Sequence, residues 1–137
     1  MNLKEAIEKG LIEKIEKDDK LVEKELEESR KDLEKAERDF EADDYKWSIV
    51  SAYYSMFHMT KAAMFERGYR EKGHLATLVF LDHLIKQGKL RGKYKGYYKS
   101  AKNRREGADY SYTYSKERAK EILEYAREYN SELEKFS

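Results

Sequence analysis

The chain contains no proline and no cysteine, and only seven of its 137 residues are glycine. Without proline, nothing in the sequence forces a helix to break except these few glycines. The absence of cysteine excludes disulfides and thiol chemistry. No stretch approaches the ~18 consecutive apolar residues of a membrane-spanning helix, and the charged N-terminus lacks the apolar core of a signal peptide. We therefore expect a cytoplasmic protein that has no contact with a membrane.

Charged residues make up 42% of the chain, and most of them are Lys, Glu and Arg. This composition is typical of proteins from hot environments and predicts a thermophilic source. A chain of this length forms one domain and buries roughly two-thirds of its unfolded surface, which is enough for a helical core. We expect a single all-α domain over residues 1–137, with an extra N-terminal helix within residues 1–18 and a core bundle over residues 19–137.

The spacing of apolar residues predicts an up-and-down bundle of about five helices, because side chains three and four residues apart share one face of a helix. The predicted core helices cover residues 20–43, 45–67, 74–87, 90–103 and 115–136, and the extra helix covers 3–15. Gly68 follows the second core helix, where a glycine favours a helix end. Residues 105–114 are predicted to form a loop.

The predicted helix over residues 45–67 is apolar on more than one face. One stripe contains Tyr53, Tyr54 and Phe57, and a second contains Met56 and Met59. The core of so short a chain can cover one stripe, so the other is expected to pack against another protein chain. We predict a homodimer with Tyr53, Tyr54 and Phe57 at its interface.

The net charge of +1 conceals a strong charge asymmetry along the sequence. Residues 1–45 contain 10 basic and 17 acidic residues, whereas residues 86–105 contain nine basic residues and no acidic one. Tyr94, Tyr97 and Tyr98 alternate with these basic residues, a combination that single-stranded nucleic acid favours. Two plainer interpretations stay open. The acidic helix can fold against the basic tract, and the tyrosines can be the core face of a weak helix.

Several sequence blocks, spread from about Leu21 to Phe136, together resemble the HEPN superfamily in its small stand-alone prokaryotic branch. These blocks are Ser51-Ala52-Tyr53-Tyr54-Ser55-Met56-Phe57-His58, Lys61-Ala62-Ala63, Gly68-Tyr69, Gly73-His74 and Arg105-Glu106-Gly107-Ala108-Asp109-Tyr110. The resemblance implies a helical module associated with nucleotides or RNA. It also implies a protein partner, since small HEPN proteins often accompany a minimal nucleotidyltransferase in toxin-antitoxin-like systems.

The basic tract and the resemblance together indicate a set of candidate residues for binding RNA or a nucleotide. They are Lys95, Lys99, Lys102, Arg104, Arg105, Asp109 and Tyr110. Catalytic HEPN proteins carry an Arg followed a few residues later by a His, but no His follows Arg105 in this chain. The group that would exchange a proton near neutral pH is therefore missing. Arg105 and His58 are the remaining catalytic candidates.

Three functions stay open at this stage. The first is a non-catalytic binding module for RNA or a nucleotide. The second is a metal-independent ribonuclease that uses Arg104 or Arg105 with His58. The third is a purely structural bundle that binds a protein partner. We expect no metal site, because the three histidines are scattered and there is no cysteine, and no cofactor, because there is no phosphate-binding glycine loop.

Overall fold

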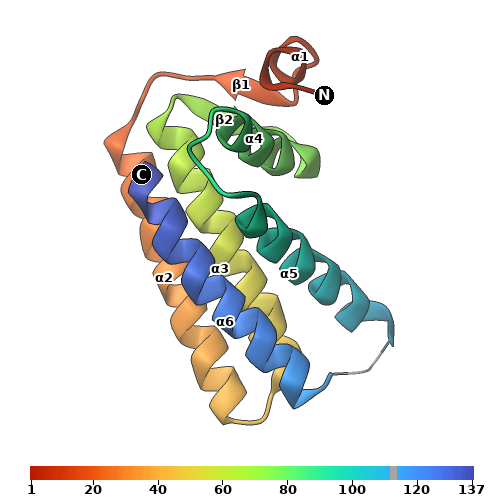
Figure 1. Cartoon of the computed structure of the whole chain (residues 1–137). Helices are drawn as coiled ribbons and strands as arrows, with labels where there is room; N and C mark the ends of the chain where they lie inside the picture. Colours follow the sequence, from red (N-terminus) through yellow and green to blue (C-terminus); the bar gives the residue numbers. More distant parts are fainter. Residues whose placement is uncertain (112–113) are drawn as a thin grey trace.

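The computed structural model describes the backbone of residues 1–111 and 114–137, and the side chains of these residues except 74 and 107–111. The described chain is a helical bundle with a two-stranded sheet at one end (Figure 1). Its helices are α1 Leu3–Glu8, α2 Asp19–Glu41, α3 Tyr45–Glu66, α4 His74–Lys86, α5 Gly92–Ser111 and α6 Lys116–Leu133, followed by a 3-10 turn, η1, over Glu134–Phe136. The predicted all-α bundle is confirmed. No described helix is both long and apolar enough to cross a membrane.

Helix α3 lies at the centre of the bundle. It packs against α2, α5 and α6, while α4 and α1 lie across one end of the molecule (Figure 1). Thirteen of the 22 residues of α3 are buried. The apolar faces predicted for this helix are therefore covered mostly by the chain itself.

Small side chains join α2 to α3. The hydroxyl of Ser29 donates a hydrogen bond to the Ser55 carbonyl at 2.7 Å, and the Ser55 hydroxyl donates to the Ser29 carbonyl at 2.6 Å. Farther along, the Ser48 hydroxyl donates to the Ala36 carbonyl at 2.8 Å. These residues allow the two backbones to approach closely, and each buried hydroxyl has a partner.

The N-terminal segment differs from the prediction, because a helix over residues 3–15 does not form. Helix α1 ends at Glu8, and Gly10 adopts a positive φ of 75° that turns the chain. The segment continues as strand β1, Ile12–Lys14, which pairs antiparallel with β2, Tyr69–Glu71. Pairing with a distant strand has displaced the local helical pattern.

Gly68 connects the end of α3 to this small sheet. Its φ is 76°, and its carbonyl accepts a hydrogen bond of 2.8 Å from the Ile15 amide. A Cβ atom at Gly68 would lie 2.8 Å from the Ile15 carbonyl oxygen. Both the conformation and the close backbone approach therefore require glycine here.

Helix α5 is longer than predicted. The helix expected over residues 90–103 continues to Ser111, so the predicted loop over 105–114 is wrong for most of its length. An ion pair of 3.1 Å between Lys102 and Glu106, four residues apart, supports the helix where the loop was expected to begin.

Candidate nucleic-acid interface

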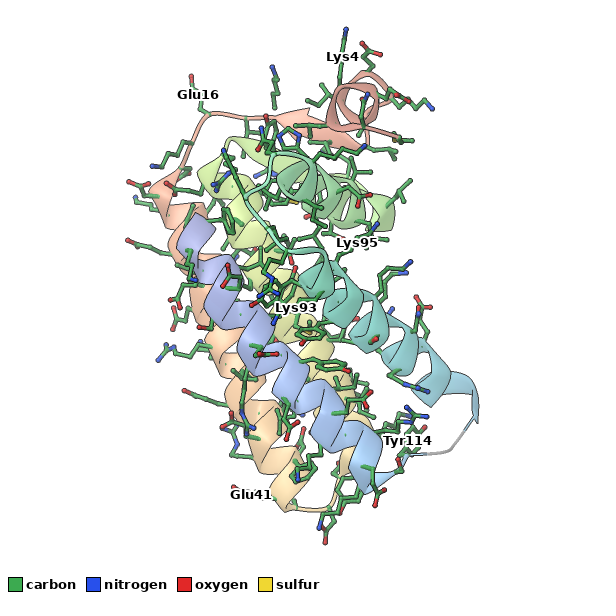
Figure 2. All side chains as sticks on the ribbon, in the orientation of Figure 1. Lys4, Glu16, Glu41, Lys93, Lys95 and Tyr114 are labelled. Carbon is green, nitrogen blue, oxygen red and sulfur yellow. The ribbon has the colours of Figure 1, made fainter. Side chains whose placement is uncertain are left out.

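The basic residues of α5 fall into neutralised and free groups. Lys95 pairs with Asp82 of α4 at 2.8 Å, near the start of α5 (Figure 2), and Lys102 pairs with Glu106. Within the described part of the chain, the exposed side chains of Lys99 and Arg104 have no ion-pair partner. Lys93 also lies exposed near the start of α5 without such a partner, so the uncompensated charge is spread along the helix from Lys93 to Arg104.

Tyr94, Tyr97 and Tyr98 of α5 are not the outward-facing rings that nucleic-acid stacking would need. Tyr98 is fully buried and Tyr94 is nearly so. The Tyr98 hydroxyl is hydrogen-bonded to that of Thr77 at 3.0 Å, and burial raises the pKa of Tyr98. The ring of Tyr97 stacks on Tyr125 of α6, with centroids 4.1 Å apart. The plainer interpretation, in which these tyrosines join α5 to the core, is correct for Tyr94 and Tyr98.

Arg105 packs its guanidinium group on the aromatic rings of α3. Its Cζ atom lies 5.0 Å from the ring centroid of Tyr53 and 5.5 Å from that of Tyr54. Nη1 donates a hydrogen bond of 3.1 Å to the Tyr54 hydroxyl, whereas Nε is buried without a partner among the described residues. No carboxylate of the described residues pairs with Arg105. The guanidinium group therefore keeps donor capacity that the described residues do not use, which suits an anion.

One face of α3 stays uncovered beside Arg105. Trp47 is 48% exposed and Tyr54 is 37% exposed, and both lie on the same helical stripe as the partly buried Phe57. Tyr53 is only 3% exposed, so it lies in the core. Of the three residues predicted at a dimer interface, Tyr54 and Phe57 therefore reach the surface.

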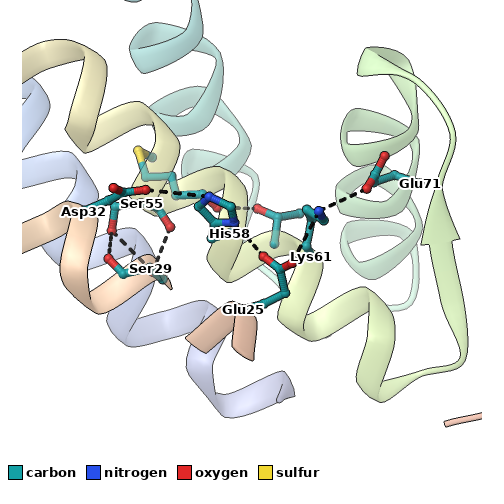
Figure 3. A network of polar contacts seen from close by, with 9 residues as sticks. Glu25, Ser29, Asp32, Ser55, His58, Lys61 and Glu71 are labelled. Atoms are coloured by element: carbon teal, nitrogen blue, oxygen red, sulfur yellow. Dashed lines mark hydrogen bonds and ion pairs between the residues drawn. The ribbon is translucent and has the colours of Figure 1, made fainter. Parts of the chain in front are cut away.

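A polar cluster occupies the next turns of α3 (Figure 3). The Nδ1 atom of His58 lies 2.5 Å from a Glu25 carboxylate oxygen, and its Nε2 atom lies 3.6 Å from a carboxylate oxygen of Asp32. Lys61 bridges Glu25 and Glu71, at 3.3 Å from each. The cluster joins α3 to α2 and β2. Both ring nitrogens of His58 face carboxylates of α2, so neither is directed to a ligand at Arg105.

The pKa values of the two carboxylates beside His58 are shifted in opposite directions. Burial raises the pKa of Glu25, but the hydrogen bond from His58 and the charge of Lys61 outweigh it and lower the pKa overall. For Asp32, burial raises the pKa and the charge of His58 offsets this only in part. Glu25 is therefore the more firmly ionised carboxylate. The burial of Glu25 could have been predicted from the sequence, because Val22, Glu25 and Ser29 lie on one stripe of α2.

The side chains of two predicted binding residues, Asp109 and Tyr110, lie outside the described part of the structure. Their backbone belongs to the last turns of α5, which continue from Arg105. Among the side chains that are described, no group of three or more His, Asp or Glu is arranged to hold a metal ion.

Comparison with protein families agrees with this arrangement. A model of the HEPN domain matches residues 22–135. The chain belongs to the HEPN family. HEPN domains are modules related to nucleotides and RNA. The HEPN match includes the whole of α3 and α5 and excludes α1 and β1. No curated protein matches the chain significantly.

Proposed function

We propose that this HEPN protein is a non-catalytic module that binds RNA or a nucleotide through the stretch of α5 that begins at Lys99. The observation that carries the proposal is the guanidinium group of Arg105, held on two tyrosine rings without a counter-charge among the described residues. Lys99 and Arg104 add exposed positive charge on the same helix. Such charges contact phosphates and make binding dependent on salt. Asp109 and Tyr110, which continue α5, belong to the proposed surface.

The proposal favours binding without cleavage. No His follows Arg105 in the sequence, and both ring nitrogens of His58 are directed to carboxylates of α2. General acid-base cleavage of RNA needs a group that can exchange a proton with the substrate. Among the side chains that the structure describes, none is therefore positioned for the proton transfer that the ribonuclease alternative needs.

We further propose that the protein is a homodimer formed through the uncovered face of α3. The large exposed rings of Trp47 and Tyr54 on one stripe support this, because such apolar surface is typical of protein contacts. The basic stretch of α5 from Lys99 to Arg105 would then border the cleft between the subunits. Light scattering at micromolar concentration should give twice the chain mass. Trp47→Glu should give a monomer. The control Leu75→Glu changes an apolar residue of similar exposure on a different helix, α4, and should stay dimeric. A monomeric wild type would contradict the dimer.

The likeness of the sequence to small HEPN proteins also supports a protein partner, a nucleotidyltransferase in a toxin-antitoxin-like system. The purely structural alternative differs in one respect that can be measured, since it predicts no affinity for RNA at physiological salt.

The test of the proposed function is incubation of the chelator-treated protein with end-labelled single-stranded RNA, with retention and cleavage scored together. We expect retention without cleavage. Retention should weaken in an Arg104→Ala/Arg105→Ala variant and stay unchanged in a Lys20→Ala/Lys24→Ala control, which removes two exposed charges from α2. Cleavage lost in the first variant would instead identify a ribonuclease. Absence of both signals would support the structural alternative.

A further inference from the structure

A groove lies between α2 and α6, on a side of the bundle separate from α5. Leu26 and Leu33 of α2 and Met59 of α3 contribute apolar surface to it, and its volume is about 720 Å³. Leu26 and Leu33 are only partly buried. The volume lies within the ~300–1,000 Å³ typical of binding sites. The groove therefore offers partly uncovered apolar surface that the fold itself does not fill.

Asn130 of α6 lines this groove with an incomplete set of hydrogen bonds. Its side chain is 7% exposed, and its Nδ2 atom donates a hydrogen bond of 2.8 Å to the Ser55 hydroxyl. Its Oδ1 atom has no partner in the described chain. The hydroxyls of Ser55 and Ser29 already donate to each other's backbone carbonyls. A buried acceptor without a donor is unfavourable. Because Oδ1 is itself buried, a donor bound in the groove meets it only after the Asn130 side chain turns toward the groove.

The free charge around the groove is negative. Glu23 and Glu134 have no ion-pair partner among the described residues. Arg127 pairs with Glu37 at 3.1 Å, and Arg30 shares Glu27 with Lys31, at 3.8 and 3.4 Å. The lining of the groove itself holds three carboxylates, Glu23, Glu27 and Glu134, against these two arginines. An incoming nucleic acid or anionic lipid surface would be repelled by the free carboxylates, whereas a basic partner would be attracted.

The dimensions of the groove fit a helix. Glu23 and Leu33, at its two ends on α2, are ten residues apart along the helix, which corresponds to about 15 Å or three turns. An amphipathic helix presents apolar anchors over a similar length when it binds in a groove between two helices.

We propose that the groove between α2 and α6 is the docking site for a basic amphipathic helix of another protein. The apolar face of this helix packs on Leu26, Leu33 and Met59. Its Lys or Arg side chains lie against Glu23 and Glu134, and the Asn130 side chain turns to accept a hydrogen bond from a donor at the centre of the face. This surface shares no residue with Arg105 or with the uncovered face of α3, so the proposal does not depend on RNA binding or on the dimer.

The probe for the test is a fluorescein-labelled amphipathic peptide of roughly 18 residues, about 27 Å long as a helix. It carries Leu on one face, a central Gln on that face and Lys on the other. Fluorescence anisotropy with the full chain should show saturable binding. Reversal of two rim charges, Glu23→Lys/Glu134→Lys, should weaken binding by about tenfold. The control Glu16→Lys/Glu41→Lys makes the same charge change at exposed residues outside the groove (Figure 2) and should have little effect.

A second measurement separates docking in the groove from general attraction between opposite charges. In NMR spectra of the full chain, the side-chain amide signals of Asn130 should shift as the peptide is added, whereas the indole signal of Trp47 should not. A peptide with Glu in place of Lys should bind much more weakly. Three results would overturn the proposal: no binding up to millimolar peptide, equal losses in the two charge-reversed variants, or shifts at Trp47 in place of Asn130.

Discussion

Replacement of Glu25 by glutamine tests the polar cluster that joins α2 to α3. Glu25 is 8% exposed, and its carboxylate contacts His58 at 2.5 Å and Lys61 at 3.3 Å. Hydrogen bonds to charged groups contribute about 1.5–3 kcal/mol each to stability. In the variant, His58 keeps Asp32 as a partner and Lys61 keeps Glu71, so part of this stabilisation is retained. We expect a net loss of about 2 kcal/mol, which lowers Tm by roughly 6–8 °C in a chain of this size.

The loss should depend on pH in a direction set by the pKa of Glu25. This pKa is lowered in the folded protein from its ordinary value of 4.5. A carboxylate with a lowered pKa contributes stability that is complete above its unfolded pKa and is lost as the pH falls through its folded pKa. The difference between wild type and variant should therefore be full at about pH 7 and smaller at about pH 3, below the ordinary pKa of the group.

The assay is thermal unfolding followed by circular dichroism at both pH values. Glu34→Gln is the matched control, because Glu34 is exposed on the same helix and forms no ion pair with a described residue. It should change stability by less than about 0.5 kcal/mol. This role of Glu25 would be contradicted if Glu25→Gln lowered stability no more than Glu34→Gln at neutral pH, or if its loss of stability were undiminished in acid.

Three further substitutions test the fold, each by the midpoint of urea unfolding. Gly96→Ala should stabilise by about 0.5–1 kcal/mol, because Gly96 lies within α5 with open space around its Cβ position, and a lowered midpoint would contradict this. Gly68→Ala should destabilise by more than about 1 kcal/mol, since its φ is positive and the new Cβ would meet the Ile15 carbonyl, so an unchanged midpoint would be inconsistent with the close approach. Tyr129→Phe should cost about 1 kcal/mol by removing the buried 2.6 Å hydrogen bond to Thr60, and a neutral effect would show that this bond adds nothing.

Much of the bundle could be predicted from local signals in the sequence. Apolar periodicity gave α2, α3, α4 and α6, and the side chains of Asp44 and Ser115 cap α3 and α6 by accepting hydrogen bonds from backbone amides. The pairing of β1 with β2 joins residues more than 50 positions apart, so no local pattern could reveal it. Apolar residues at 3, 7, 11 and 12 suit a helix, but Gly10 leaves the helical conformation.

The candidate site could be predicted only in part from the sequence. The sequence placed the basic tract on a helix, yet charge alone could not show which cations are neutralised, because Asp82, the partner of Lys95, lies on another helix. The contact of Arg105 with Tyr54 joins residues 51 positions apart and depends on how α5 packs on α3. The groove at Asn130 was missed for the same reason, since its walls come from opposite ends of the chain.

In the proposed function, the guanidinium group of Arg105, packed on Tyr53 and Tyr54, binds an anionic group of RNA or a nucleotide. The most direct test is the affinity of the Arg105→Lys variant for labelled single-stranded RNA, measured by fluorescence anisotropy beside the wild type and a Lys99→Arg control. Lysine keeps the charge but lacks the planar fork that stacks on the rings and binds phosphate through two hydrogen bonds. We predict a loss of about tenfold for Arg105→Lys, equivalent to ~1.4 kcal/mol, and little change for the control. Wild-type affinity in Arg105→Lys would contradict the claim.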